Sequence, residues 1–130
     1  MTDQIKLNLK ELFKTYPSIL VVYFYGSGVT GYTNKQSDLD LAVVVDDPTA
    51  IDYGDLYLKI NQIIKNQEVD LRIVTLTNTP TYLFQVLKNS QRIYQRDELE
   101  RVNLESQILR DFYDTQHIRD IYDSYLKQAF

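Results

Sequence analysis

The segment SILVVYFY, residues 18–25, constrains the fold of this chain more than any other feature of the sequence. It is short, rich in β-branched and aromatic residues, and closed by Gly26, a combination typical of a buried strand. Two later segments, DLDLAVVVDD and EVDLRIVTL, have the same character and predict a second and a third strand. Together they predict a sheet at the centre of one domain, since 130 residues usually form a single core.

Apolar residues recur at helical spacing on both sides of these strands. They predict helices over residues 3–16 and 51–66, and a short helix that begins near Pro80. The segment QRIYQRD is expected to be an edge strand or an extended link, and the chain from about Asp97 onward is expected to form one long or broken helix. This order predicts an α/β (α+β) fold in which helices cover a small mixed sheet.

Composition excludes several classes of function. The chain has no cysteine, which excludes disulfides and cysteine zinc sites and leaves carboxylates or His117 as ligands for hard ions such as Mg²⁺. No stretch reaches the roughly 18 apolar residues of a membrane span, and the N-terminus does not resemble a signal peptide, so a cytoplasmic protein is expected. A formal net charge of −4 argues against general nucleic-acid binding and favours a protein or small-molecule partner.

The chemistry of the chain is expected where the first strand gives way to GSGVTGYTNKQSDLD. Asp38 and Asp40 are two residues apart on the second strand, so their side chains point to one face while Leu39 enters the other. Two neighbouring carboxylates repel each other unless a proton or a divalent cation compensates them. Mg²⁺ typically binds one or two carboxylates together with substrate phosphates, so this pair predicts a nucleotide site.

The glycine-rich turn supplies the other half of that site. Gly26 and Gly28 allow the backbone to approach a ligand closely, and Ser27 can offer a hydroxyl and an amide to phosphate oxygens. The residues that follow allow the chain to aim its amides at a triphosphate and return to the sheet with its carboxylates beside that triphosphate.

A third carboxylate follows in VDLRI. Alternation along this strand places Asp70 and Arg72 on one face, so Asp70 can join the aspartate pair if the two strands are neighbours. Three carboxylates suit two Mg²⁺ ions, and Asp70 could also accept the proton of an attacking hydroxyl. For Arg72 a salt bridge to one of the aspartates and a contact with the nucleotide are equally consistent with the sequence.

The segment GSGVTGYTNKQSDLDL followed by VDLRI resembles the minimal nucleotidyltransferases, the MNT domains of the DNA polymerase β superfamily, and in particular the MNT antitoxins of HEPN/MNT toxin–antitoxin pairs. The resemblance covers about residues 1–95 and leaves residues 96–130 as a C-terminal helical tail of the same domain. It implies ATP as nucleotide donor, Mg²⁺ as cofactor, and transfer of AMP to a tyrosine of a HEPN toxin ribonuclease, which neutralises the toxin in a hetero-oligomer.

The resemblance also implies roles for individual residues. Asp38, Asp40 and Asp70 would be the catalytic and metal-binding residues, and the nucleotide would be bound by Gly26, Ser27, Gly28 and Arg72. Thr30 stands where many relatives carry arginine, so Arg72 or Lys35 is the candidate basic group facing the phosphates.

Two other functions are compatible with such a domain. An antitoxin could act by binding alone, but a chain without catalysis has no reason to hold three like charges together. A nucleotidyltransferase of the antibiotic-resistance kind would modify a small molecule, but it would normally need a sizeable acceptor-binding domain, for which the roughly 35 residues after the core are too few.

The tail carries two apolar stripes. Leu99, Val102, Ser106, Leu109 and Tyr113 form the first, which we expect to be core. Leu104, Ile108 and Phe112 form the second, which Ile118 and Tyr122 continue and which we expect to face a protein partner. His117 follows Arg110 by seven residues, as in a HEPN ribonuclease motif, but without the rest of a HEPN bundle it is expected to be a helix-surface residue.

Overall fold

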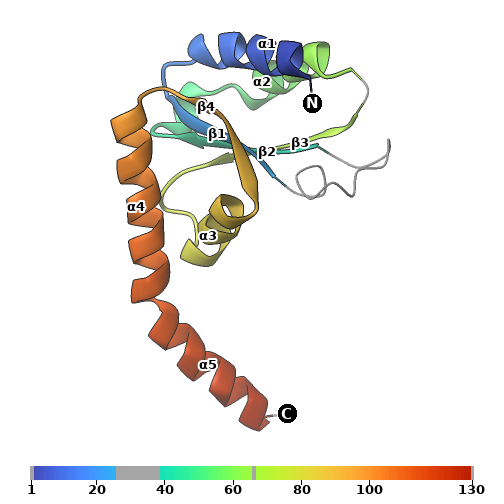
Figure 1. The fold of residues 1–130 in the computed structure, drawn as a ribbon. Helices are drawn as coiled ribbons and strands as arrows, with labels where there is room; N and C mark the ends of the chain where they lie inside the picture. The colour runs from blue at the N-terminus through green and yellow to red at the C-terminus, as the bar shows by residue number, and fades with distance from the viewer. Residues whose placement is uncertain (1, 26–38, 66, 130) are drawn as a thin grey trace.

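Figure 1 shows the computed structural model of the chain, which describes residues 2–25, 39–65 and 67–129. In this described part, four strands form one sheet in the order β3-β2-β1-β4. The strands are β1 (Ile19–Tyr25), β2 (Leu39–Val45), β3 (Val69–Val74) and β4 (Ser90–Gln95). β1 runs antiparallel to both β2 and β4, whereas β2 and β3 are parallel. The predicted mixed sheet is confirmed, and QRIYQRD contributes its edge strand β4.

Helices cover both faces of this sheet (Figure 1). On one face lie α1 (Asp3–Lys14) and α2 (Tyr53–Ile63), which follows the short 3-10 helix η1 (Pro48–Ala50). On the other face lie α3 (Pro80–Lys88) and α4 (Glu98–Asp114). Two helix layers explain why the segment that became β1 is an unbroken apolar run, since both of its faces are buried.

Each face has its own core. Leu9 and Phe13 of α1 pack with Leu56 and Ile60 of α2 against the odd-numbered residues of β2, and all four helix residues are fully buried. The opposite core contains residues of β1 and β2 and of the helices α3 and α4, namely Val21, Tyr23, Ala42, Val44, Leu83, Val86, Leu104 and Ile108. Capping side chains fix where three of the helices begin, because Thr2, Asp52 and Asp97 each accept a hydrogen bond from a first-turn amide.

The tail is a broken helix. α4 ends at Asp114, and α5 (Gln116–Ala129) continues after Thr115, extending away from the sheet (Figure 1). Arg119 of α5 reaches back to α4, donating a hydrogen bond of 2.6 Å to the Phe112 carbonyl and lying 4.0 Å from the centroid of the Phe112 ring. The ring of Phe112 also stacks on Phe84 of α3, at a centroid distance of 3.9 Å. These three side chains join α5, α4 and α3.

The first stripe of the tail was expected to be core and the second to face a partner, and this expectation was wrong for α4. Leu104 and Ile108 are 5% and 1% exposed and belong to the core, whereas Leu99 and Tyr113 of the first stripe are 68% and 58% exposed. Both stripes have helical spacing, so the sequence gives no reason to prefer one. The choice is made by the side of α4 that meets Val21 and Val44 of the sheet.

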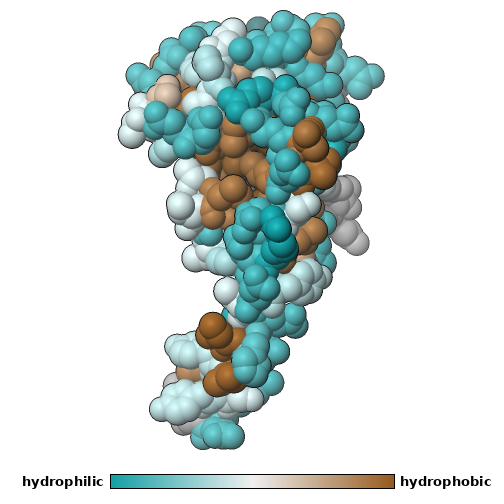
Figure 2. All heavy atoms as spheres, turned by 90° about the vertical axis from the view of Figure 1, so that its left-hand side faces the viewer, coloured by the Kyte–Doolittle hydropathy of each residue, from teal (hydrophilic) through white to brown (hydrophobic). Residues whose placement is uncertain are grey.

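The prediction for α5 is confirmed in part, because Ile118 and Tyr122 are exposed. Apolar side chains stand out on this lower helix in Figure 2. His117 is also exposed on α5, as expected for a helix-surface residue. None of the helices in the described part of the chain has the length and apolar character of a membrane span.

Candidate active site

Two rows of side chains cross the sheet on the face that α3 and α4 cover. In the first row Asp70 of β3 is the register partner of Asp40 of β2, which pairs with Tyr25 of β1, which in turn pairs with Ser90 of β4. Register partners point to the same face, and adjacent strands lie about 4.8 Å apart. The sheet therefore places the carboxylates of Asp40 and Asp70 side by side, as the sequence predicted on condition that the two strands were neighbours.

The second row lies two residues away on each strand, later in the sequence on β2, β3 and β4 and earlier on the antiparallel β1. It runs from Arg72 through Ala42 and Tyr23 to Arg92. The polar first row thus has an arginine behind each of its ends, at the two edges of the sheet. Beyond this second row the face becomes apolar and is closed by the core that contains Val21 and Val44.

Arg72 forms a salt bridge with the neighbouring aspartate. Its Nε lies 3.6 Å from Oδ2 of Asp70, and the two side chains are 55% and 42% exposed. A pair so exposed contributes at most about 1 kcal/mol to stability. Arg72 also lies over the ring of Tyr82, 5.9 Å from its centroid. The salt-bridge alternative for Arg72 is confirmed, and its predicted contact with a nucleotide stays a prediction.

Two tyrosines that sequence reasoning missed complete the neighbourhood of Asp40. The hydroxyls of Tyr25 on β1 and Tyr82 on α3 are 3.1 Å apart and hydrogen-bonded. Burial and the hydrogen bond with Tyr82 raise the pKa of Tyr25 well above its ordinary value, while Arg72 lowers it and Asp40, with a smaller effect than Arg72, raises it. Tyr25 is therefore a neutral hydrogen-bonding group beside the carboxylates. Its position at the end of β1, directly before the glycine-rich turn, is the sequence signal that could have revealed it.

The remaining predicted site residues lie outside the described residues. They are Gly26, Ser27, Gly28 and Asp38, together with Thr30 and Lys35. Residues 26–38 are flanked in the sequence by Tyr25 and Leu39, and Tyr25 belongs to the first row. Within the described ranges, no three His, Cys, Asp or Glu side chains gather closely enough to hold a metal ion. Asp40 and Asp70 supply two of the three predicted ligands, and paired carboxylate oxygens fit a hard ion such as Mg²⁺.

Comparison with known proteins shows to which family the chain belongs. The model of the polymerase beta nucleotidyltransferase family matches residues 7–99, a range that contains all four strands of the sheet. The chain belongs to the polymerase beta nucleotidyltransferase family. The matched residues include both rows of the candidate site. They also include most of α1 and all of α2, which cover the opposite face of the sheet. No protein among the curated ones matches the chain.

Solved structures share this fold over nearly the whole length of the chain. A chain of a toxin–antitoxin crystal structure with AMP-PNP has a TM-score of 0.67 and 20% identity, covering 93% of this chain and 98% of that one. A chain from the complex of a tri-AMPylated Shewanella oneidensis HEPN toxin with an MNT antitoxin has a TM-score of 0.67 and 16% identity, covering 99% and 98%.

A third similar structure is a spectinomycin adenyltransferase from Enterococcus faecialis, solved with ATP and spectinomycin. Its TM-score is 0.59 at 19% identity, and the match covers 90% of this chain but only 66% of that one. The common part is therefore a fold that the larger enzyme extends.

Proposed function

We propose that this chain is an antitoxin and protein adenylyltransferase, which transfers AMP from ATP to a tyrosine hydroxyl of a HEPN-family toxin ribonuclease and thereby neutralises it. The observation that carries the proposal is the register pairing of Asp40 with Asp70 in a member of this nucleotidyltransferase family. The shared fold with chains of toxin–antitoxin complexes, over almost the full length of both chains, supports the choice of a toxin as acceptor.

In this proposal the two halves of the site bind the donor. Gly26, Ser27 and Gly28 would contact the triphosphate, and Asp38, Asp40 and Asp70 would hold Mg²⁺ ions. When bound, Mg²⁺ neutralises phosphate charge and lowers the pKa of a coordinated hydroxyl. The exposed Arg72 beside Asp70 would lie near the phosphates and stands in for the arginine that many relatives carry at the position of Thr30.

Asp70 would act on the acceptor side. Its carboxylate takes the proton of the tyrosine hydroxyl, the phenolic oxygen forms a bond to the α-phosphorus of ATP, and the bond from that phosphorus to the bridging oxygen breaks, releasing pyrophosphate. Tyr25, held neutral and hydrogen-bonded to Tyr82, would fix the position of its register partner Asp40 without competing with it for positive charge. Catalysis would come mainly from positioning and charge neutralisation.

The surface of α5 favours a protein acceptor over a small molecule. Residues 1–95 contain the sheet and the site, and residues 96–130 contribute α4 and α5. The helix α5 presents exposed apolar side chains of the kind that contact proteins.

Mass spectrometry of a HEPN toxin co-purified with this chain tests the proposal. We expect the toxin to gain AMP units only when ATP and Mg²⁺ are present, with the modified residue a tyrosine. Asp70→Asn should slow this gain, whereas Asp114→Asn, at an exposed carboxylate on the last turn of α4, should not. Toxin inhibition by the wild-type chain without any gain in mass would instead identify an antitoxin that acts by binding alone.

A further inference from the structure

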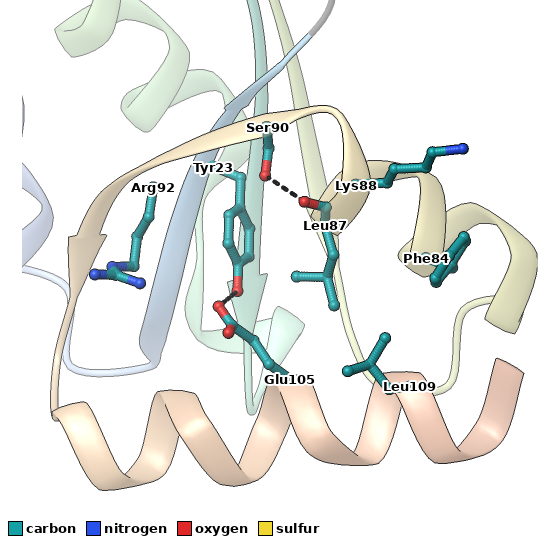
Figure 3. A pocket seen from close by; sticks show the side chains of 8 residues that line it. All are labelled: Tyr23, Phe84, Leu87, Lys88, Ser90, Arg92, Glu105 and Leu109. Carbon is teal, nitrogen blue, oxygen red and sulfur yellow. Dashed lines mark hydrogen bonds between the residues drawn. The ribbon is translucent and has the colours of Figure 1, made fainter. Parts of the chain in front are cut away.

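A cavity of about 420 Å³ opens between β4, α3 and α4, on the same face of the sheet as the carboxylates (Figure 3). Its size lies within the range of small-molecule sites. Ser90, which lines it, is the last member of the row that contains Asp40 and Asp70. Because Ser90 is two strands away from Asp40, the cavity begins about 10 Å from the carboxylate pair.

The lining of the cavity combines three kinds of side chain. Phe84, Leu87 and Leu109 give it apolar walls, and Arg92 and Lys88 stand on opposite sides of it, with the ammonium of Lys88 pointing away from the other side chains (Figure 3). Its floor is formed by Tyr23, whose hydroxyl donates a hydrogen bond of 2.8 Å to Glu105. Burial and this hydrogen bond raise the pKa of Tyr23 well above its ordinary value, so Tyr23 brings no negative charge into the cavity.

Arg92 stands out among the charged groups. All six arginines lie in the described part of the chain, and within that part Arg92 alone has a side chain without a hydrogen bond or an ion pair. Glu105 is not its partner, because that carboxylate bonds to Tyr23 and to Arg101. Arg92 is exposed on the edge strand at the rim of the cavity, where its guanidinium fork can bind a carboxylate or a phosphate.

The positive charge, the apolar walls and Glu105 together favour one class of anionic ligand over others. An acidic side chain would use only the positive charge, and a triphosphate would bring more negative charge than Arg92 can match beside Glu105. A nucleoside monophosphate uses all three kinds of group, with its phosphate on Arg92, its base against Phe84 and Leu109, and a hydroxyl or amino group donating to Glu105. A phosphodiester, with one negative charge, matches a single arginine best.

We infer that this cavity binds the AMP group that the reaction leaves on the acceptor tyrosine. This inference rests on the proposed transfer of AMP to a protein. The cavity holds the product group after it has left the carboxylates, so the modified acceptor stays on the protein longer than the unmodified one. Arg92 is then a product-binding residue on the opposite edge of the sheet from Arg72.

Binding of O-adenylyltyrosine amide to the full chain, measured by calorimetry without ATP, Mg²⁺ or toxin, tests the inference. We expect this probe to bind more tightly than tyrosine amide. Arg92→Gln should weaken its binding about tenfold or more, which is the effect of losing a charge-assisted hydrogen bond. The matched control Arg110→Gln changes an exposed arginine that bonds only to Gln107 of its own helix, and should leave the affinity unchanged. Leu109→Trp, at a position 39% exposed, should block the cavity while thermal unfolding is unaffected.

Equal affinity of the probe for the wild type and Arg92→Gln, or equal affinity of the wild type for the probe and for tyrosine amide, would overturn the inference. A titration with free AMP shows whether the cavity prefers AMP attached to a tyrosine or the free nucleotide. Weaker binding of AMP than of the probe supports an acceptor-linked ligand, and tighter binding of AMP contradicts it. Failure of the proposed function would appear elsewhere, as a wild-type chain that transfers no AMP to the toxin from ATP.

Discussion

Asp40 and Asp70 stand directly opposite each other on two adjacent parallel strands, although 30 positions separate them in the sequence. The intervening chain forms η1 and α2, which cross over one face of the sheet, while the two carboxylates share the other. The site is thus created by a parallel pairing that needs such a crossover.

Asp40→Asn should abolish AMP transfer and weaken Mg²⁺-dependent ATP binding, and we expect the same of Asp38→Asn. Both changes remove charge from the proposed donor side, and Asp40 is only partly buried, at the end of a strand, so the fold should survive. Circular dichroism and ATP titration check the two parts of the prediction. Normal transfer by either variant would mean that the site lies elsewhere.

Asp70→Asn should slow AMP transfer much more than it weakens ATP binding. Because its proposed role is to accept the proton of the acceptor, ATP should bind nearly normally while transfer slows about 10²- to 10⁴-fold, the usual effect of losing a general base. Equilibrium ATP binding and single-turnover transfer to the toxin measure the two quantities. If this variant loses ATP binding as severely as Asp40→Asn does, the division of roles between the two carboxylates is incorrect.

Alkaline pH should destabilise the fold through Tyr23. The pKa of this tyrosine is raised above its ordinary value of 10.0, so above pH 10 the unfolded chain loses a proton that the folded protein keeps. The free energy of unfolding should therefore fall by up to about 1.4 kcal/mol per pH unit above that point. Urea denaturation over this range should show a shallower fall for Tyr23→Phe. An identical pH dependence in this variant would show that Tyr23 ionises normally in the fold.

The core role of α4 predicts a large loss of stability when one of its apolar residues is truncated and almost none for another. Ile108→Ala should lower the free energy of unfolding by about 2–5 kcal/mol, since the side chain is 1% exposed and its removal leaves a cavity. Leu99→Ala, at a position 68% exposed on the same helix, should change it by less than about 0.5 kcal/mol. Denaturant unfolding ranks the two variants, and the reverse ranking would restore the original assignment of the stripes.

Removal of residues 116–130 should leave a folded chain that still binds ATP. Among the described residues, α5 contributes none to either core, whereas Ile108 of α4 does, so a shorter chain that ends near Glu105 and lacks Ile108 should unfold. We expect the variant without α5 to associate poorly with its toxin, because the exposed Ile118, Tyr122 and their neighbours are lost. Pull-down and thermal unfolding test these expectations. Full toxin affinity in the variant would assign the interface to the body of the domain.

The central strand β1 could be predicted from the sequence because a strand covered on both faces is an unbroken apolar run. The pairing of Asp40 with Asp70 followed from period-two alternation and one assumption, that the strands were neighbours. The orientation of α4 did not follow, because two stripes of equal spacing compete and tertiary contacts decide. Arg92 was missed for a related reason, since a register shift in β4 between its pairings with Val22 and Tyr23 fixes which face the arginine occupies.

The contacts of Arg119 with Phe112, and of Phe112 with Phe84, have a mechanical consequence. Phe84 is also a wall of the cavity, so an unbroken series of side chains runs from the projecting helix to that wall. Packed aromatic rings are stiff and transmit displacement instead of absorbing it. The projecting helix α5 is therefore connected, through the ring of Phe112, to a wall of the cavity more than one helix away.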